Sequence, residues 1–425
     1  MITRLFAAII LFTSLLISGE KNPVARSGID SVASTLYAEG NYWKLMEYAK
    51  QFSADTLSAK FNFFLGMSYA ALSEPQRAQE FLRRSIALDS VKLQYRYQYA
   101  RILSQTGLYN DAIDQLTQCI AIDSTYIPAH FQLGLTYAAQ KKHPEKEVEI
   151  FSSLINRNPR DFLSLYYIAE AKKRLGESDS AYMYLRLSLS ANPRYYPALI
   201  AVSNYLNNKK QYSEALPYYL LADTLRNDNK DLKFQIGECY RKLEDLPKAK
   251  TYFSRAIALD TANALYHAQL AYAYYSAGQF DSSVAEYQLA ILNDSENPQY
   301  YTNLALVYKK LDMTDRVAQA YLNAVRVQHP DVIAYTYNDL AAFYMQKKLW
   351  RKTIAAYQRA LDVNPDLIDP YYYMGVSHMN MDEIQSAILM FKKFLQKTEN
   401  NPEKRGQMYS AEKMIEYLKN LKKKN

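Results

Sequence analysis

Amide side chains recur at a fixed spacing along this sequence. Gln98 and Gln132 are 34 residues apart, and so are Gln235 and Gln269. A primary amide both donates and accepts hydrogen bonds, so a row of amides can bond the alternating N–H and C=O groups of an extended backbone, whatever its sequence. The row therefore predicts recognition of an extended chain, and it requires a scaffold that repeats with the same period.

Residues of the kinds that carry out catalysis or bind metals show no useful pattern. The 425 residues include two cysteines, Cys119 and Cys239, and five histidines, without HExxH or CxxC spacing. Eight of the eleven glycines recur at two positions of the repeat described below, which leaves no phosphate-binding loop, and no G-x-S-x-G motif is present. We therefore predict a protein that is not an enzyme, with no cofactor and no metal, and we interpret both cysteines as small core residues.

The chain repeats about every 34 residues. The repeats begin, with successive spacings of 33 to 36, at Arg26, Ala59, Leu93, Ile127, Phe162, Tyr196, Lys230, Ala264, Pro298, Ala334 and Ile368. Position 7 of the repeat is large and apolar, position 8 is small and position 11 is mostly Tyr. After a turn, position 20 is often Ala, position 24 is large and position 27 is small. Each spacing places its residues on one face of a helix, so every repeat predicts two helices that press their small residues together.

This pattern resembles the tetratricopeptide repeat, and the resemblance covers residues 26–401 in eleven repeats. It implies an all-α fold, a right-handed α-solenoid (superhelix) of helix-turn-helix units. Residues 402–421 place apolar residues at helical spacing and are expected to form a capping helix over the last open face. A basic tail follows at 422–425.

In the tetratricopeptide family, positions 2, 5, 6, 9, 12 and 13 of each first helix line a concave groove that binds extended protein segments. Carried onto this sequence, the resemblance implies three sets of groove residues. The amides are Gln98, Gln132, Asn204, Asn208, Gln235, Gln269 and Asn303. The aromatic residues are Phe63, Tyr97, Phe131, Tyr166, Phe234, Tyr272 and Tyr372. The cations are Lys173, Arg174, Arg241 and Lys242, and the same rule adds Lys309 and Lys310. The alternative is that Gln is present as a good helix former and that the aromatic residues pack between neighbouring helices.

Residues 1–19 have the features of an export signal. One cation, Arg4, precedes an apolar run over 5–17 that is shorter than the roughly 20 residues needed to span a bilayer. Ser18 and Gly19 offer a cleavage site before Glu20. We predict a cleaved signal peptide, with an uncleaved N-terminal anchor as the alternative. No cysteine lies nearby, so we expect an exported protein that is periplasmic or associated with the outer membrane or cell surface, and not a lipoprotein.

The net charge of +8 does not indicate nucleic-acid binding. Arg4 and Lys422, Lys423 and Lys424 account for four of these charges, and the rest are dispersed. The predicted function is a non-catalytic protein–protein interaction scaffold of the cell envelope. It would hold an extended protein segment in the groove, with edges open to a membrane-bound complex. The alternative is an envelope protein that binds glycans on the aromatic residues, because exposed ring faces stack on sugars.

Overall fold

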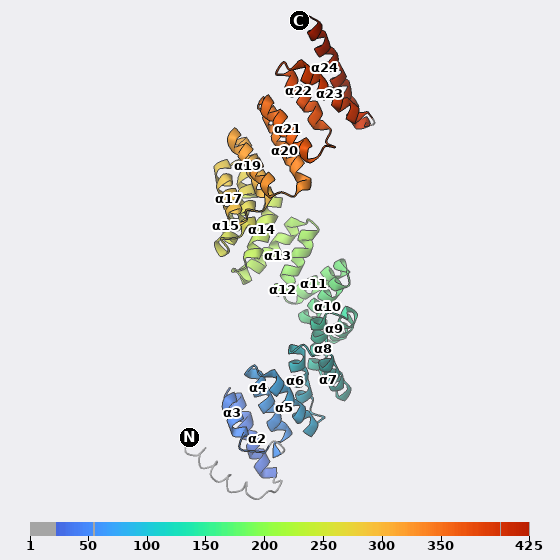
Figure 1. Ribbon diagram of the computed structural model, residues 1–425. Helices are drawn as coiled ribbons and strands as arrows, with labels where there is room; N and C mark the ends of the chain where they lie inside the picture. Colours follow the sequence, from blue (N-terminus) through green and yellow to red (C-terminus); the bar gives the residue numbers. More distant parts are fainter. Residues whose placement is uncertain (1–22, 54–55, 400, 425) are drawn as a thin grey trace. The chain divides into compact units, whose positions relative to one another are not determined.

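Every regular element that the structure describes is a helix (Figure 1). The computed structural model describes residues 23–53, 56–399 and 401–424. The prediction of an all-α helical-repeat solenoid is confirmed. The expected export signal at 1–19 lies outside the described residues, as does Asn425 at the end of the basic tail. The chain divides into two compact units, residues 1–209 and 210–425, which are described separately.

The N-terminal unit consists, in its described part, of five helix pairs followed by the first helix of a sixth (Figure 1). Its helices are α2 (Pro23–Ala38), α3 (Tyr42–Ala49), α4 (Ala59–Ala71), α5 (Pro75–Leu88), α6 (Leu93–Gln105), α7 (Tyr109–Ile122), α8 (Ile127–Gln140), α9 (Pro144–Arg157), α10 (Phe162–Arg174), α11 (Ser178–Ala191) and α12 (Tyr196–Asn208). Within this unit, each helix packs on its neighbours in sequence, as expected for a stack of repeats.

The C-terminal unit begins with the second helix of the sixth pair and continues through five further pairs. Its helices are α13 (Tyr212–Leu225), α14 (Lys230–Lys242), α15 (Leu246–Leu259), α16 (Ala264–Ser276), α17 (Phe280–Asn293), α18 (Pro298–Lys310), α19 (Thr314–Val327), α20 (Pro330–Gln346), α21 (Trp350–Val363), α22 (Asp369–Met379), α23 (Ile384–Thr398), the 3-10 helix η2 (Pro402–Lys404) and α24 (Arg405–Lys424). None of the described helices of either unit is both long enough and apolar enough to cross a membrane.

From α4 onward, two first helices begin away from the residues that the repeat pattern indicates, and α2 already begins at Pro23, three residues before Arg26. Helix α20 begins at Pro330, four residues before Ala334, because His329 caps it by accepting a bond from the amide of Asp331 and because proline fits the first helical turn. Helix α22 begins at Asp369, one residue after Ile368. At the end of the chain, α24 packs on α23 in the region where we expected a capping helix.

The turn inside each helix pair has one conformation throughout. Position 15 has a positive φ in all eleven repeats, between 57° and 80°, at Gly40, Ser73, Gly107, Lys141, Gly176, Lys210, Glu244, Gly278, Asp312, Lys348 and Asp382. In most repeats the next amide bonds back to the carbonyl five residues earlier, as Glu74 does to Tyr69 at 2.9 Å and Asp245 to Tyr240 at 2.9 Å. This Schellman ending stops the first helix and returns the chain for the second. Seven non-glycine residues thus adopt a left-handed conformation that costs L-residues free energy.

Small residues at position 8 allow the two helices of a pair to approach closely. A Cβ built on Gly134 would lie 2.5 Å from Cζ of Phe151, and one on Gly237 would lie 2.7 Å from the Phe253 ring. Both phenylalanines are fully buried. The small residue therefore provides the space that the large residue of the second helix occupies.

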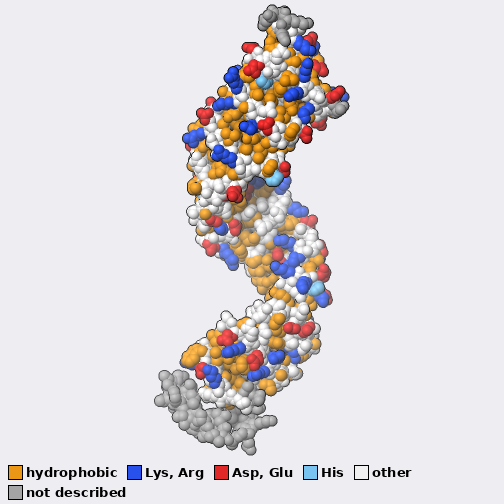
Figure 2. Space-filling model, in the orientation of Figure 1, with side chains coloured by type: hydrophobic (Ala, Val, Ile, Leu, Met, Phe, Trp, Pro, Cys, Tyr) orange, Lys and Arg blue, Asp and Glu red, His pale blue; other side chains and the backbone are white. Residues whose placement is uncertain are grey.

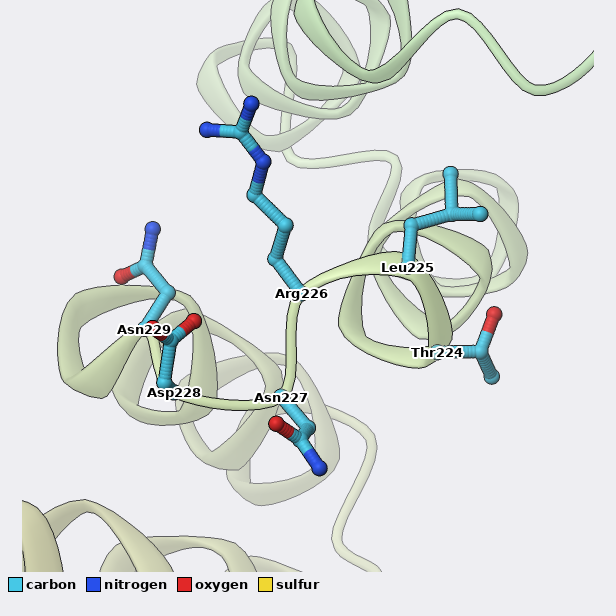
Figure 3. Close-up of a pocket in the computed structure, with 6 residues that line it drawn as sticks. All are labelled: Thr224, Leu225, Arg226, Asn227, Asp228 and Asn229. Carbon is cyan, nitrogen blue, oxygen red and sulfur yellow. The ribbon is translucent and has the colours of Figure 1, made fainter.

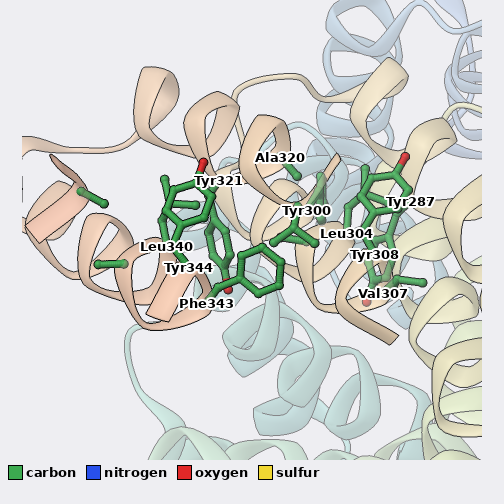
Figure 4. Close-up of a cluster of buried hydrophobic side chains, with 14 of the residues drawn as sticks. Tyr287, Tyr300, Leu304, Val307, Tyr308, Ala320, Tyr321, Leu340, Phe343 and Tyr344 are labelled. Carbon is green, nitrogen blue, oxygen red and sulfur yellow. The ribbon is translucent and has the colours of Figure 1, made fainter. Parts of the chain in front are cut away.

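The cores of the repeats join into longer clusters. In the C-terminal unit one cluster runs through α16 to α22 and is rich in tyrosine, including Tyr287, Tyr300, Tyr308, Tyr321 and Tyr344 (Figure 4). Each tyrosine presents an apolar ring to the core while its hydroxyl lies at the ring's far end. Position 11 tyrosines also carry a cation from the second helix above the ring, at 5.2–5.7 Å, in the pairs Tyr69–Arg77, Tyr137–Lys146, Tyr240–Lys248, Tyr308–Arg316 and Tyr344–Lys352. These two roles account for much of the abundance of tyrosine.

Candidate functional site

The side chains at positions 5, 6, 9, 12 and 13 of the first helices define the candidate site, which we call the first-helix face. Its predicted amides differ in accessibility. Asn204 and Asn208 on α12 are exposed. The others are half-buried: Gln98 on α6, Gln132 on α8, Gln235 on α14, Gln269 on α16 and Asn303 on α18.

Among the described residues, three of the half-buried amides have no hydrogen-bond partner for their side chains. Gln98 accepts a bond from Arg101 at 3.1 Å, and Asn303 accepts one from Gln299 at 2.9 Å. The side chains of Gln132, Gln235 and Gln269 form no hydrogen bond within the described part of the chain. A half-buried amide without a partner retains both its donor and its acceptor capacity for a ligand.

Most of the predicted aromatic residues pack against rings of adjacent helices or of the loops before them. Phe63 on α4 is only 5% exposed, and its ring centroid lies 4.9 Å from that of Tyr95 on α6. It therefore belongs to the core and offers no ring face to a ligand. Other predicted aromatics make similar contacts, in the pairs Tyr97–Tyr126, Phe131–Phe151, Tyr166–Tyr195, Phe234–Tyr266 and Tyr372–Phe394.

Tyr272 on α16 is the most accessible of the predicted aromatics, at 42% exposure. The guanidinium of Arg241 lies 5.3 Å from the centroid of its ring. Arg241 also donates two bonds to Glu238, at 2.8 Å from Nε and 2.7 Å from Nη2, and this pairing raises the pKa of Arg241. The guanidinium of Arg241 and the ring of Tyr272 therefore form a cation–π contact within the fold.

The remaining predicted cations fall into two groups. Lys173 and Lys242 are exposed. Arg174, at the end of α10, is paired with Glu147 on α9. Sequence reasoning missed Glu147, a fully buried carboxylate at the fourth residue of a second helix. The signal was available, because most other second helices have Ala there, as in Ala112, Ala181 and Ala249.

The cysteines and histidines serve the packing of the repeats. Cys119 and Cys239 are buried thiols, and burial raises their pKa to about 11 and about 12, which disfavours the reactive thiolate. His130 and His267, both at position 4, place Nε2 3.0 Å and 3.1 Å from loop carbonyls six residues earlier. Arg96 and Tyr301 contact the equivalent loop carbonyls, so position 4 fastens the connection between repeats. No group of three or more His, Cys, Asp or Glu suited to a metal ion occurs among the described residues.

An open depression lies over the loop between α13 and α14, lined by residues 224–229 (Figure 3). Its side chains point in different directions and do not converge on one point, as Arg226, Asn227 and Leu225 illustrate (Figure 3). It lacks a nucleophile with an adjacent base, so its geometry does not define an active site. On the molecular surface, positive and negative side chains are interspersed over the visible face (Figure 2).

Comparisons with known proteins support the repeat assignment. Family models described as "TPR repeat" and "Tetratricopeptide repeat" match residues 271–312, and residues 93–126 and 231–263. The chain is 27% identical over 173 residues to the RNA polymerase-associated protein CTR9 of Caenorhabditis elegans, which covers 38% of this chain and 14% of the relative. It is 23% identical over 180 residues to anaphase-promoting complex subunit 6 of Arabidopsis thaliana, which covers 40% of this chain and 32% of the relative. The chain thus spans at most about a third of these curated relatives.

Among solved structures, the C-terminal part of a TPR repeat-containing protein from Cytophaga hutchinsonii matches with a TM-score of 0.49 and 20% identity. That match covers 57% of this chain and 99% of the other. The fold and the first-helix face define an all-α helical-repeat protein of the kind that serves as a protein–protein interaction scaffold. The chain contains tetratricopeptide repeats, which the family models match over these three segments, within an array of helical repeats.

Proposed function

We propose that this protein is a non-catalytic scaffold that binds extended protein segments in a concave groove formed by the first-helix faces within each unit. The observation that carries the proposal is the unpaired state of Gln132, Gln235 and Gln269 within the described chain. Gln235 and Gln269 occupy position 6 of consecutive repeats in the C-terminal unit, so they present their amides at a repeating interval. Such amides suit the backbone of an extended segment, because each bonds an N–H and a C=O without regard to side chains.

The glycan-binding alternative has weaker support. Sugar recognition needs exposed ring faces, and most of the predicted rings contact other rings across helices. Tyr272 is accessible, but Arg241 already lies beside its ring. The arrangement favours a polypeptide ligand over a saccharide.

The proposal is tested with linear peptides selected from a random display library on the full chain. Replacing Gln98, Gln132, Gln235 and Gln269 by Ala should weaken binding of the selected peptides by about tenfold or more, because several hydrogen bonds are lost together. The temperature of unfolding should not change, because these side chains support little of the fold. Gln385→Ala, an exposed amide on the second helix α23, is the matched control and should bind as wild type. Unchanged affinity in the fourfold variant would defeat the proposal, and binding of soluble glycans with no peptide recovered would favour the alternative.

We further propose that the protein is exported and works in the cell envelope, where its edges contact a membrane-bound complex. The support is the sequence of residues 1–19, with one cation before an apolar run. Fractionation of cells that produce the chain with a C-terminal tag, followed by mass spectrometry of its N-terminus, tests the location. A mature chain that begins near Glu20 is expected in the envelope fraction. An intact Met1 in the cytosol would disprove export.

A further inference from the structure

The ammonium group of Lys309, at position 12 of α18, lies beside two aromatic rings. It is 5.0 Å from the ring centroid of Tyr321 and 5.5 Å from that of Phe343. These rings come from α19 and α20, the next two helices of the C-terminal unit (Figure 4). Lys309 is half-buried, and within the described residues its ammonium forms no hydrogen bond or ion pair. Burial lowers its pKa. The two rings stabilise the positive charge, but the N–H donors of Lys309 have no acceptor among the described residues.

Asp339, at position 6 of α20, supplies the opposite charge at this place. Asp339 stands four residues before Phe343 on α20, so the two side chains share one face of that helix, and the carboxylate lies one turn from the ring beside Lys309. Within the described residues the two charged groups form no ion pair. Asp339 is exposed to solvent, but burial by surrounding atoms raises its pKa. Its carboxylate has no hydrogen-bond donor among the described residues.

We propose that Lys309 and Asp339 form a subsite for the primary amide of an Asn or Gln side chain in a bound protein segment. The proposal rests on the function proposed above, because the subsite lies on the first-helix face. The amide oxygen would accept from Lys309 and the amide nitrogen would donate to Asp339. A primary amide has one N–H on the same side as its C=O and one on the opposite side, so it can join two groups that stand side by side or face each other.

The charges of the subsite select against other ligands. A carboxylate that approached Lys309 would be repelled by Asp339, and an ammonium that approached Asp339 would be repelled by Lys309. An apolar side chain would leave both half-desolvated charges without a partner. A neutral group with both a donor and an acceptor can bond to both charges. Among protein side chains, Asn and Gln carry an N–H donor and a C=O acceptor in one neutral group.

The test compares the peptides that different variants of the full chain select from one random linear-peptide display library. The variants are Lys309→Met, Asp339→Asn, the double variant, and the control Lys392→Met, which removes an exposed cation on the second helix α23, outside the first-helix face. Methionine retains the apolar stem beside Tyr321 and Phe343, so the variant should fold. Unfolding temperatures measured alongside the selection check this.

We expect wild type and Lys392→Met to enrich Asn or Gln at one peptide position. Asp339→Asn should shift that position to Asp or Glu, and Lys309→Met should shift it to Lys or Arg, because one charge is then unopposed. Replacing the selected Asn or Gln by Ala should weaken binding to wild type about tenfold and to the double variant less than twofold. The same preference in all variants would overturn the subsite and leave the scaffold proposal intact. Failure of wild type to select any peptide would overturn both.

Discussion

Arg174, at the end of α10, donates a hydrogen bond to Glu147 on α9, whose side chain has no exposed surface. The pair joins the second helix of one repeat to the first helix of the next. Only Oε2 of Glu147 has a partner, and Oε1 is buried without one. Burial of a carboxylate is costly unless its partners are retained, so this contact makes the stability of the α9–α10 interface depend on a single arginine.

Removing the arginine alone should destabilise the protein. Arg174→Met leaves the Glu147 carboxylate buried without its partner, and we expect a loss of about 2 kcal/mol, below the roughly 3–5 kcal/mol of a fully buried pair because Arg174 is partly solvated. Glu147→Ala restores the residue that most repeats have there and should be neutral or stabilising. The double variant should resemble Glu147→Ala. Urea unfolding of the three variants checks this, and a double variant as unstable as Arg174→Met would contradict it.

The same carboxylate should make stability depend on pH. Burial raises the pKa of Glu147 above its ordinary value, against the opposing effect of Arg174. The unfolded chain therefore releases this proton at a lower pH than the folded protein does, so the contribution to stability falls as pH rises and stays low above the folded pKa. Glu147→Gln should become more stable relative to wild type as pH rises above about 4, where the unfolded carboxyl group releases its proton. Urea midpoints across this range measure the effect. Glu149→Gln, an exposed neighbour, should show no such trend.

A single added methyl group should disrupt the close approach of α8 and α9. Gly134→Ala places a Cβ 2.5 Å from Phe151, a buried ring that is itself stacked on Tyr167, so we expect a loss of roughly 1–3 kcal/mol. Gly406→Ala on α24 is the matched control, because no atom lies within 4 Å of its added Cβ. It should stabilise the helix by about 0.5 kcal/mol. Equal unfolding temperatures for both variants would refute the role of Gly134.

The turn residue at position 15, which has a positive φ, provides a second test with glycine. Here introducing a glycine should stabilise the protein and removing one should destabilise it. Ser73 has φ of 62°, so Ser73→Gly should stabilise the protein by about 0.5–1 kcal/mol. Gly176→Ser should destabilise it by a similar amount, because φ there is 80° although space for a side chain is free. Thermal unfolding measures both changes. If Gly176→Ser left the unfolding temperature unchanged, backbone conformation would not limit the stability of these turns.

The last helix should protect the end of the stack. Leu418 on α24 is 2% exposed and belongs to a cluster with Phe391 and Phe394 of α23. Leu418→Ala should cost about 2–4 kcal/mol, and because repeats stabilise mainly their neighbours, the loss should remain local. Hydrogen exchange should become faster in α22, α23 and α24 and stay unchanged in α4 and α5. Tyr417→Ala, at an exposed position, is the control. Uniformly faster exchange over the whole chain would contradict a local cap.

The glycines show which features of the fold could be predicted from the sequence. The recurrence of Gly134, Gly237 and Gly375 at position 8 indicated a close approach of two helices, and the built Cβ positions meet large buried rings there. Gly40 and Gly176 indicated a turn at position 15, but the sequence did not reveal that Lys141 and Glu244 adopt the same left-handed conformation. Lys141 and Glu244 adopt this conformation because the packing of the helices on either side determines the path of the turn.

The candidate site was harder to predict. Position rules placed Phe63 and Phe234 on the first-helix face, whereas their contacts with Tyr95 and Tyr266 depend on how one repeat packs on the next. The same holds for the amides: a position number does not reveal that Gln98 bonds Arg101 while Gln235 has no partner in the described chain.

The sequence by itself determined the helices, their pairing and the tetratricopeptide repeat, because local periodicity and the alternation of small and large residues act within about 34 residues. The tertiary structure decided which polar groups remain available. Lys309 and Asp339 are 30 positions apart and lie on different helices, and only the packing of α18, α19 and α20 places the ammonium of Lys309 beside Phe343, one helical turn from Asp339. Contacts between repeats depend on helix-packing geometry, which residue spacing does not encode.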